Sequence, residues 1–152
     1  MARKPTDEHD VRYNEPQMMA ILNLDTIGLL NWRVELNPVM MEEWAKLCML
    51  WNGIGRDDLV DFVRTVNDPR FLPVDRAFRK QYDGFPAVTW TVGKENSRLI
   101  LADYVRTVMP DETLGNPDHV KARFAIALAK VPSDELDVTV DIHGIHVRMW
   151  WD

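Results

Sequence analysis

The most informative stretch of this sequence is its C-terminal end, 136-LDVTVDIHGIHVRMWW-151. Apolar residues occupy every second position on both sides of His143-Gly144, and such alternation indicates two half-buried strands. A two-residue loop with glycine in the second place is typical of a type I′ turn. The sequence therefore predicts an antiparallel hairpin in which Leu136–Ile142 pairs with Ile145–Trp151.

The predicted turn defines the register of this hairpin, because Ile142 then lies opposite Ile145. One face carries only apolar pairs, which are Ile142/Ile145, Val140/Val147, Val138/Met149 and Leu136/Trp151. The other face carries the pairs Asp141/His146, Thr139/Arg148 and Asp137/Trp150. Each apolar pair contributes up to ~1 kcal/mol, and the apolar face needs a helix or another strand to cover it.

Outward from the hairpin, the sequence alternates between extended and helical patterns. Strands are expected at Asn31–Leu36 and Ala87–Val92, where apolar residues recur with period two. Helices are expected after Pro16 and at 38–51, Asp57–Val66, Pro73–Tyr82, Asn96–Met109 and 117–131. The segment Asn96–Met109 is rich in β-branched residues, so a strand is the alternative there.

The helix expected to follow Asn37 and Pro38 has an unusually wide apolar surface. Asparagine at the N-cap and proline at the first helical position are strong start signals. The apolar arc spans roughly 200°, about twice the minimum for a surface helix. This helix is therefore central to the core or covered by a partner, and a homo-oligomer would also explain it. Cys48, on the same helix, is expected to be a buried, inert thiol.

Length and composition predict one domain of ordinary size. The chain has 152 residues, a net charge of −6 and one cysteine, so a disulfide framework is excluded. No apolar run approaches the ~18 residues that cross a bilayer, and residues 1–15 have no secretory apolar region. We predict a flexible arm at 1–15 and a cytoplasmic, helix-rich α+β domain at 16–152, whose small antiparallel sheet includes the C-terminal hairpin.

The negative charge is concentrated at the C-terminus. Residues 132–152 contain five acidic residues and one basic residue, so they account for −4 of the total charge of −6. Such acidity argues against a general polyanion binder. The candidate protein-binding residues are therefore Asp137, Asp141, Arg148 and Trp150, on the mixed face of the hairpin.

These residues support two interpretations. Exposed tryptophan beside charged side chains is typical of protein-binding hot spots. Alternatively, Asp141, His146 and Arg148 could perform acid–base chemistry in a small hydrolase, with His119 nearby. A solvated cross-strand ion pair is the structural explanation of the same residues. His143 and His146 lack the further ligands that a metal ion would need.

The sequence contains two other charged clusters. Arg70, Arg76, Arg79 and Lys80 form a basic cluster that could meet an acidic protein or, second to it, nucleic acid, but a solvated helix face is the preferred explanation. Three acids at the start of one helix, Asp57, Asp58 and Asp61, could bind a hard cation. Acidic residues are also simply favourable at a helix N-terminus, so no metal is predicted there.

Motifs for catalysis are missing from the sequence. It contains no Walker A motif, G-x-G-x-x-G, H-E-x-x-H or G-x-S-x-G elbow. We therefore expect a small non-catalytic interaction factor of the inhibitor, immunity or assembly type, without a cofactor. Its expected partner is another protein, and a phage or mobile-element origin would suit such a chain. The hydrolase is the first alternative, and nucleic-acid binding through the basic cluster is the second.

Overall fold

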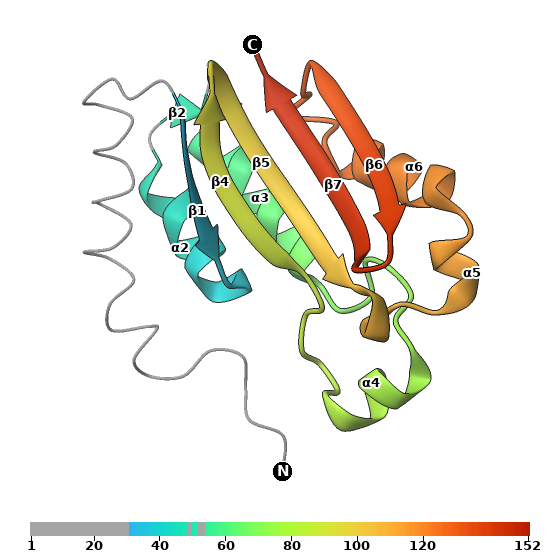
Figure 1. The fold of residues 1–152 in the computed structure, drawn as a ribbon. Helices are drawn as coiled ribbons and strands as arrows, with labels where there is room; N and C mark the ends of the chain where they lie inside the picture. The colour runs from blue at the N-terminus through green and yellow to red at the C-terminus, as the bar shows by residue number, and fades with distance from the viewer. Residues whose placement is uncertain (1–30, 49, 52–53) are drawn as a thin grey trace.

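The computed structural model describes residues 31–48, 50–51 and 54–152, and its main element is a five-stranded antiparallel sheet. The strand order is β1-β4-β5-β7-β6, so β1 and β6 are the edge strands (Figure 1). The strands are β1 (Asn31–Leu36), β4 (Thr89–Glu95), β5 (Ser97–Val105), β6 (Glu135–Asp141) and β7 (Gly144–Trp151). The predicted α+β class, with the C-terminal hairpin in an antiparallel sheet, is confirmed.

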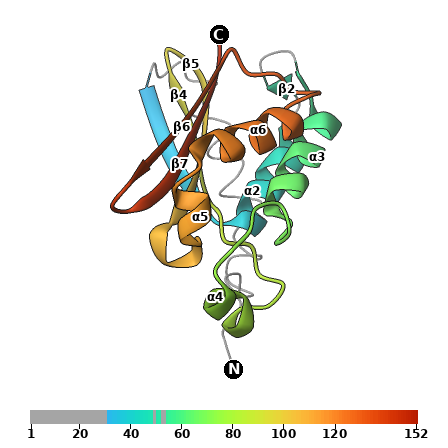
Figure 2. The same cartoon turned by 90° about the vertical axis from the view of Figure 1, so that its right-hand side faces the viewer.

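Three helices cover one face of this sheet, as the edge-on view in Figure 2 shows. They are α2 (Pro38–Leu47), α3 (Arg56–Asn67) and α6 (Pro117–Ala127). The shorter helices are α4 (Arg76–Gln81), α5 (Asp111–Leu114) and the 3-10 turn η1 (Arg106–Val108). A two-stranded ladder of β2 (Leu50–Trp51) and β3 (Ile54–Gly55) connects α2 to α3. Every helix in the described residues is too short or too polar to span a membrane.

The hydrophobic core lies between the three helices and the sheet, and Trp90 of β4 is at its centre. Trp90 is fully buried and meets the ring of Phe62 of α3 edge to face, with the ring centroids 5.9 Å apart. Its indole N–H donates to the Asn67 Oδ1 atom at 2.7 Å, and Asn67 Nδ2 donates to the carbonyl of Pro38 at 3.0 Å. One asparagine thus joins the end of α3, the start of α2 and the sheet.

The hairpin faces are as predicted, but the register is displaced by two residues. Val140 pairs with Ile145, and the turn is Ile142-His143 instead of His143-Gly144. A type I′ turn requires positive φ at both turn residues, yet Asn96 is the one non-glycine residue with positive φ in the described chain. Ile142 consequently leaves the apolar face and is 80% exposed.

Gly144 explains this displacement. It has φ of +140° and is the first residue of β7, where it pairs with Val105 of β5. A Cβ atom here would lie 1.9 Å from the carbonyl oxygen of Tyr104. Glycine therefore permits close approach of two strands, while the side chain of Asp141 accepts the backbone N–H of His143 at 2.7 Å and closes the turn.

The helix predicted at Asn96–Met109 is wrong, because this segment forms β5 and η1. Strand β5 lies between β4 and β7, and its apolar residues are buried on both faces. Leu99 and Ile100 are adjacent and point to opposite sides, yet both are fully buried. A strand buried on both sides loses its period-two pattern, so it resembles a buried helix in sequence.

Three predicted helices are shorter than expected, and one of them, predicted at 117–131, ends at Ala127. The helix after Pro38 ends at Leu47 because Leu50–Trp51 pairs with Ile54–Gly55. The helix predicted at Pro73–Tyr82 is reduced to α4, none of whose residues is buried. Six residues make less than two turns, so α4 cannot present the apolar stripe that was predicted.

Other expectations are confirmed. The Asn37 side chain caps α2 by accepting the backbone N–H of Met40 at 2.8 Å, and Asn116 caps α6. The wide apolar surface of α2 packs on α3 and the sheet, and Cys48 is buried in the same core. The expected arm at 1–15 and the helix expected after Pro16 lie outside the described residues.

Candidate protein-binding face

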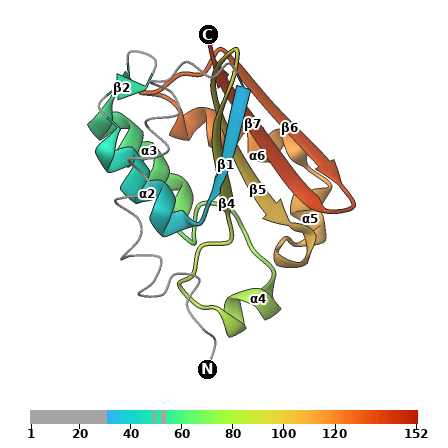
Figure 3. The same ribbon diagram turned by 60° about the vertical axis from the view of Figure 1, so that its left-hand side comes forward.

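The sheet face opposite the helices carries most of the residues singled out by the sequence analysis. We call it the open face, because none of the described helices packs on it (Figures 2 and 3). Alternation along the strands assigns side chains to this face. Its charged and aromatic members are Arg33, Glu35, Glu95, Asp103, Glu135, Asp137, Asp141, His146, Arg148 and Trp150.

The open face is predominantly acidic. Six of these residues are carboxylates, contributed by all five strands except β7, and two are arginines. A hollow of about 610 Å³ runs over the face from Arg33 to Asp137 and Thr139. The surface therefore carries a concentration of negative charge that attracts cationic groups.

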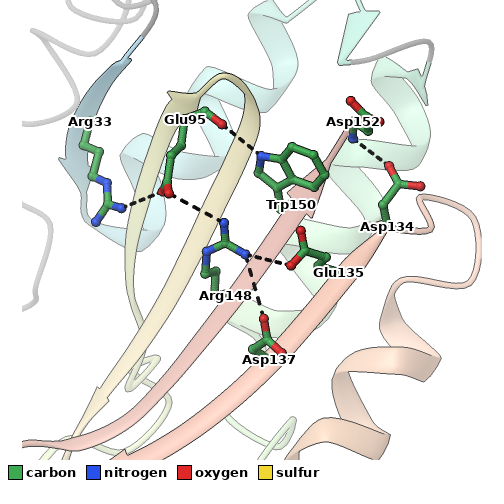
Figure 4. Close-up of polar contacts among 8 residues, drawn as sticks. All are labelled: Arg33, Glu95, Asp134, Glu135, Asp137, Arg148, Trp150 and Asp152. Carbon is green, nitrogen blue, oxygen red and sulfur yellow. Dashed lines mark hydrogen bonds and ion pairs between the residues drawn. The ribbon is translucent and has the colours of Figure 1, made fainter.

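Arg148 lies among three of the carboxylates, as Figure 4 shows. Its guanidinium nitrogens are 3.6 Å from Glu135, 3.8 Å from Asp137 and 3.9 Å from Glu95. Glu95 also accepts a hydrogen bond from Arg33 at 3.0 Å. These pairs are partly exposed and hence individually weak, but together they connect strands β1, β4, β6 and β7 across the face.

An apolar centre lies beside this network. Trp150 is half-buried, and its indole N–H donates to the backbone carbonyl of Glu95 at 3.1 Å (Figure 4). Its cross-strand neighbour Leu99 is fully buried although it points to the open face. An anchored tryptophan with apolar surface, surrounded by charged groups, is the arrangement found at the centre of many protein interfaces.

The His146 ring is held between two carboxylates. Its Nδ1 atom is 2.7 Å from Asp103 Oδ1, and its Nε2 atom is 2.9 Å from Asp141 Oδ1. We call these three residues the histidine clip. Ionised carboxylates only accept hydrogen bonds, so both contacts are hydrogen bonds when the two ring nitrogens are protonated and the ring is positively charged.

The pKa values follow from this geometry. Hydrogen bonds from the ring, first to Asp141 and then to Asp103, raise the pKa of His146 above 6.5, and partial burial opposes them. The pKa of Asp141 is lowered from 3.8 by the His146 ring and then by the backbone N–H of His143. With the His146 ring protonated, the clip is a charged link between the hairpin turn and β5.

We expect the histidine clip to make stability depend on pH. The native state holds the His146 proton more tightly than the unfolded chain, so this stabilisation is complete below pH 6.5 and lost as pH rises through the raised pKa. The Asp141 contribution is present above pH 3.8 and lost as pH falls through its lowered pKa. Urea unfolding across pH 4–9 should show the free energy of unfolding falling above pH 6.5 in wild type.

The His146→Gln variant should lose this alkaline decline, because glutamine does not titrate. His119→Gln is the matched control: His119 is an exposed histidine of α6, on the helical side of the sheet. Its profile should follow that of wild type. Parallel profiles for wild type and His146→Gln would show that the clip does not contribute.

The acid–base candidates are only partly brought together. Asp141 contacts His146, but Arg148 forms its ion pairs with Glu95, Glu135 and Asp137. His119 belongs to α6, which packs on the other side of the sheet. Both ring nitrogens of His146 already bind carboxylates, so a reacting group would have to displace one of them.

The basic cluster is dispersed by local contacts. Arg70 pairs with Asp68 at 2.9 Å and lowers the pKa of that carboxyl to about 2. The Arg79 guanidinium donates to the backbone carbonyl of Pro69. Arg76 and Lys80 are exposed on α4. Two of the four cations thus hold the loop before α4.

The acids at 57, 58 and 61 lie along α3, with Asp57 and Asp58 in its first turn. Within the described residues, no three His, Cys, Asp or Glu side chains are grouped closely enough to hold a metal ion. The favourable position of acids at a helix N-terminus accounts for Asp57 and Asp58.

Asp103, Glu95 and Arg33 are members of the open face that the sequence pattern alone does not identify. The helix predicted at Asn96–Met109 contains Asp103, and such a helix does not place this carboxylate beside His146. Alternation along a strand at 97–105 places Leu99, Leu101 and Asp103 on one face, whereas Glu95 and Arg33 reach this face through the pairing of β4 with β5 and of β1 with β4. Comparisons with family models, curated proteins and solved structures returned no match. Function is therefore inferred from the geometry of the chain itself.

Proposed function

We propose that this protein is a non-catalytic factor that uses its open face to bind a basic surface on another protein. The observation that carries the proposal is a sheet face that presents six carboxylates and the half-buried Trp150 and that none of the described helices covers. An inhibitor, an immunity protein or an assembly factor would use such a face in the same way.

In this proposal, the charged groups and the apolar surface contribute to binding in different ways. The carboxylates increase the rate of encounter with a cationic partner and discriminate against acidic ones. Trp150 supplies contact area at low entropic cost, because its ring is already held by the Glu95 carbonyl. Binding of this kind weakens as salt concentration rises.

The histidine clip supports a binding function over catalysis. A general base needs a free ring nitrogen near its operating pH, whereas both nitrogens of His146 are bonded to carboxylates. Nucleic acid is disfavoured as a partner because the face is acidic and two of the four cations in the basic cluster make local contacts.

Affinity capture from the native host tests the proposal. Wild type and Trp150→Ala serve as baits at low and high salt, and bound proteins are quantified by mass spectrometry. A basic protein captured by wild type should fall at least tenfold with Trp150→Ala, since central tryptophans contribute roughly 2 kcal/mol or more. Ile126→Ala is the control, because Ile126 is an exposed apolar residue of α6, away from the open face.

A second pair of variants separates charge from folding. Glu35→Gln with Asp137→Asn neutralises two acids of the open face, and Asp61→Asn with Asp83→Asn neutralises two exposed acids elsewhere. Both pairs change the net charge equally, and circular dichroism checks that both fold. Binding through the open face would be refuted if the two double variants captured equal amounts of partner and Trp150→Ala captured as much as wild type.

A further inference from the structure

The edge strand β6 offers a second, more specific means of recognition. It runs along the outer side of β7 without a break in register from Glu135 to Asp141 (Figure 1). Alternate N–H and C=O groups of any edge strand point away from the sheet and can pair with another chain. Strand β6 contains neither lysine nor proline, two residues that commonly protect edges.

The two sides of β6 differ in chemistry. On the open face, the side chains of Glu135, Asp137 and Asp141 are 50%, 59% and 51% exposed. On the helical face, Val138 and Val140 are only partly buried against the core. An added strand would therefore meet acids with one set of alternate side chains and apolar groups with the other.

Open space borders this edge. The hollow that runs over the open face is lined by three consecutive β6 residues, 137–139, whose side chains alternate between the faces. It is also lined by Pro117 and Lys121 of α6, from the helical side. The hollow thus borders β6 on the open face and on the helical face, and it adjoins the outer backbone edge of this strand.

Charge selects the occupant of this edge. If two copies paired through β6 in antiparallel fashion around Val138, Glu135 of each would oppose Asp141 of the other, and like charges opposite each other are destabilising. The other edge strand, β1, presents Arg33 as well as Glu35 to the open face, so it lacks this selectivity. Strand β6 disfavours its own copy and favours a cationic strand.

We propose that β6 binds an extended segment of the partner in which basic and apolar residues alternate, so that the segment becomes a sixth strand of the sheet. The proposal rests on the proposed function, since it specifies how a basic protein engages the acidic side of this molecule. Main-chain hydrogen bonds would provide affinity, and the alternating side chains would provide specificity, as in other cases of β-augmentation.

Three synthetic peptides test this mode. The first is acetyl-Lys-Val-Lys-Val-Lys-Val-Lys-amide, the second has the same residues as a Lys block followed by a Val block, and the third is the first with alternate backbone amides N-methylated. Affinity is measured by titration calorimetry, and amide hydrogen exchange is followed across β6. The alternating peptide should bind at least tenfold more tightly than the other two and should slow exchange of the outward-facing β6 amides.

The outcomes separate this inference from the proposed function. Equal affinity for the alternating and block peptides, with unchanged exchange in β6, would overturn strand addition. If Trp150→Ala still abolished capture in that case, binding by the open face would stand without it. In another outcome, the alternating peptide slows amide exchange in β6 and Trp150→Ala captures as much partner as wild type does. That result would support strand addition at β6 and refute binding through the open face.

Discussion

Replacing Gly144 with alanine is expected to lower the free energy of unfolding by roughly 3–5 kcal/mol, because strain and a steric clash combine at this position. The added Cβ would lie 1.9 Å from the Tyr104 carbonyl oxygen and 2.8 Å from the Arg106 nitrogen. Both are backbone atoms of the β5–η1 segment, so they cannot move aside as a flexible side chain can. Urea unfolding and a decrease in Tm of about 10 °C would record this loss.

Gly84→Ala is the matched control for Gly144→Ala. Gly84 also has positive φ, +80°, but no heavy atom lies within 4 Å of a Cβ built there. Its substitution should cost only about 1 kcal/mol, the usual conformational penalty. The difference between the two variants measures the close approach of β7 to β5. Similar losses of stability in Gly84→Ala and Gly144→Ala would contradict the close approach of β7 to β5 at Gly144.

Replacing Trp90 with alanine is the second large expected effect, a loss of roughly 3–5 kcal/mol. The change empties the centre of the core, removes the edge-to-face contact with Phe62 and leaves Asn67 Oδ1 without its donor. Equilibrium unfolding monitored by far-UV circular dichroism measures the loss. Ile126→Ala, at a site that is 72% exposed, should change stability by less than about 0.5 kcal/mol.

Trp90→Phe separates packing from hydrogen bonding in the same site. Phenylalanine keeps an aromatic ring against Phe62 but cannot donate to Asn67, so this variant should lose about 1–3 kcal/mol. Combining it with Asn67→Ala completes a double-mutant cycle. A coupling energy near zero would contradict the role of Asn67 as a link between α2, α3 and the sheet.

Local signals in the sequence were sufficient for much of the fold. Asn37-Pro38 and Asn116-Pro117 start α2 and α6 because capping and proline geometry act within one turn. Strand β5 could not be recognised in this way, since burial on both faces depends on neighbours far along the chain. The hairpin faces followed from alternation, whereas its register depended on a contact between Gly144 and Tyr104 that no local pattern reveals.

The candidate site was predictable to the same extent. Asp137, Asp141, His146, Arg148 and Trp150 share a face because they belong to one hairpin. The partners that β4 and β5 bring to that face come from outside the hairpin and depend on tertiary pairing. The expected contact of His146 with Asp141 is present, but the second carboxylate that occupies its other nitrogen required the position of β5.

The strand order also bears on how the chain folds. Hairpins β4–β5 and β6–β7 are joined by tight turns, and structures of this kind form within about 1–10 μs. The pairing of β5 with β7 closes a loop that contains η1, α5 and α6. Closing such long loops costs entropy before the new contacts form. Docking of the two preformed hairpins along the β5–β7 seam is therefore expected to be the rate-limiting step of folding.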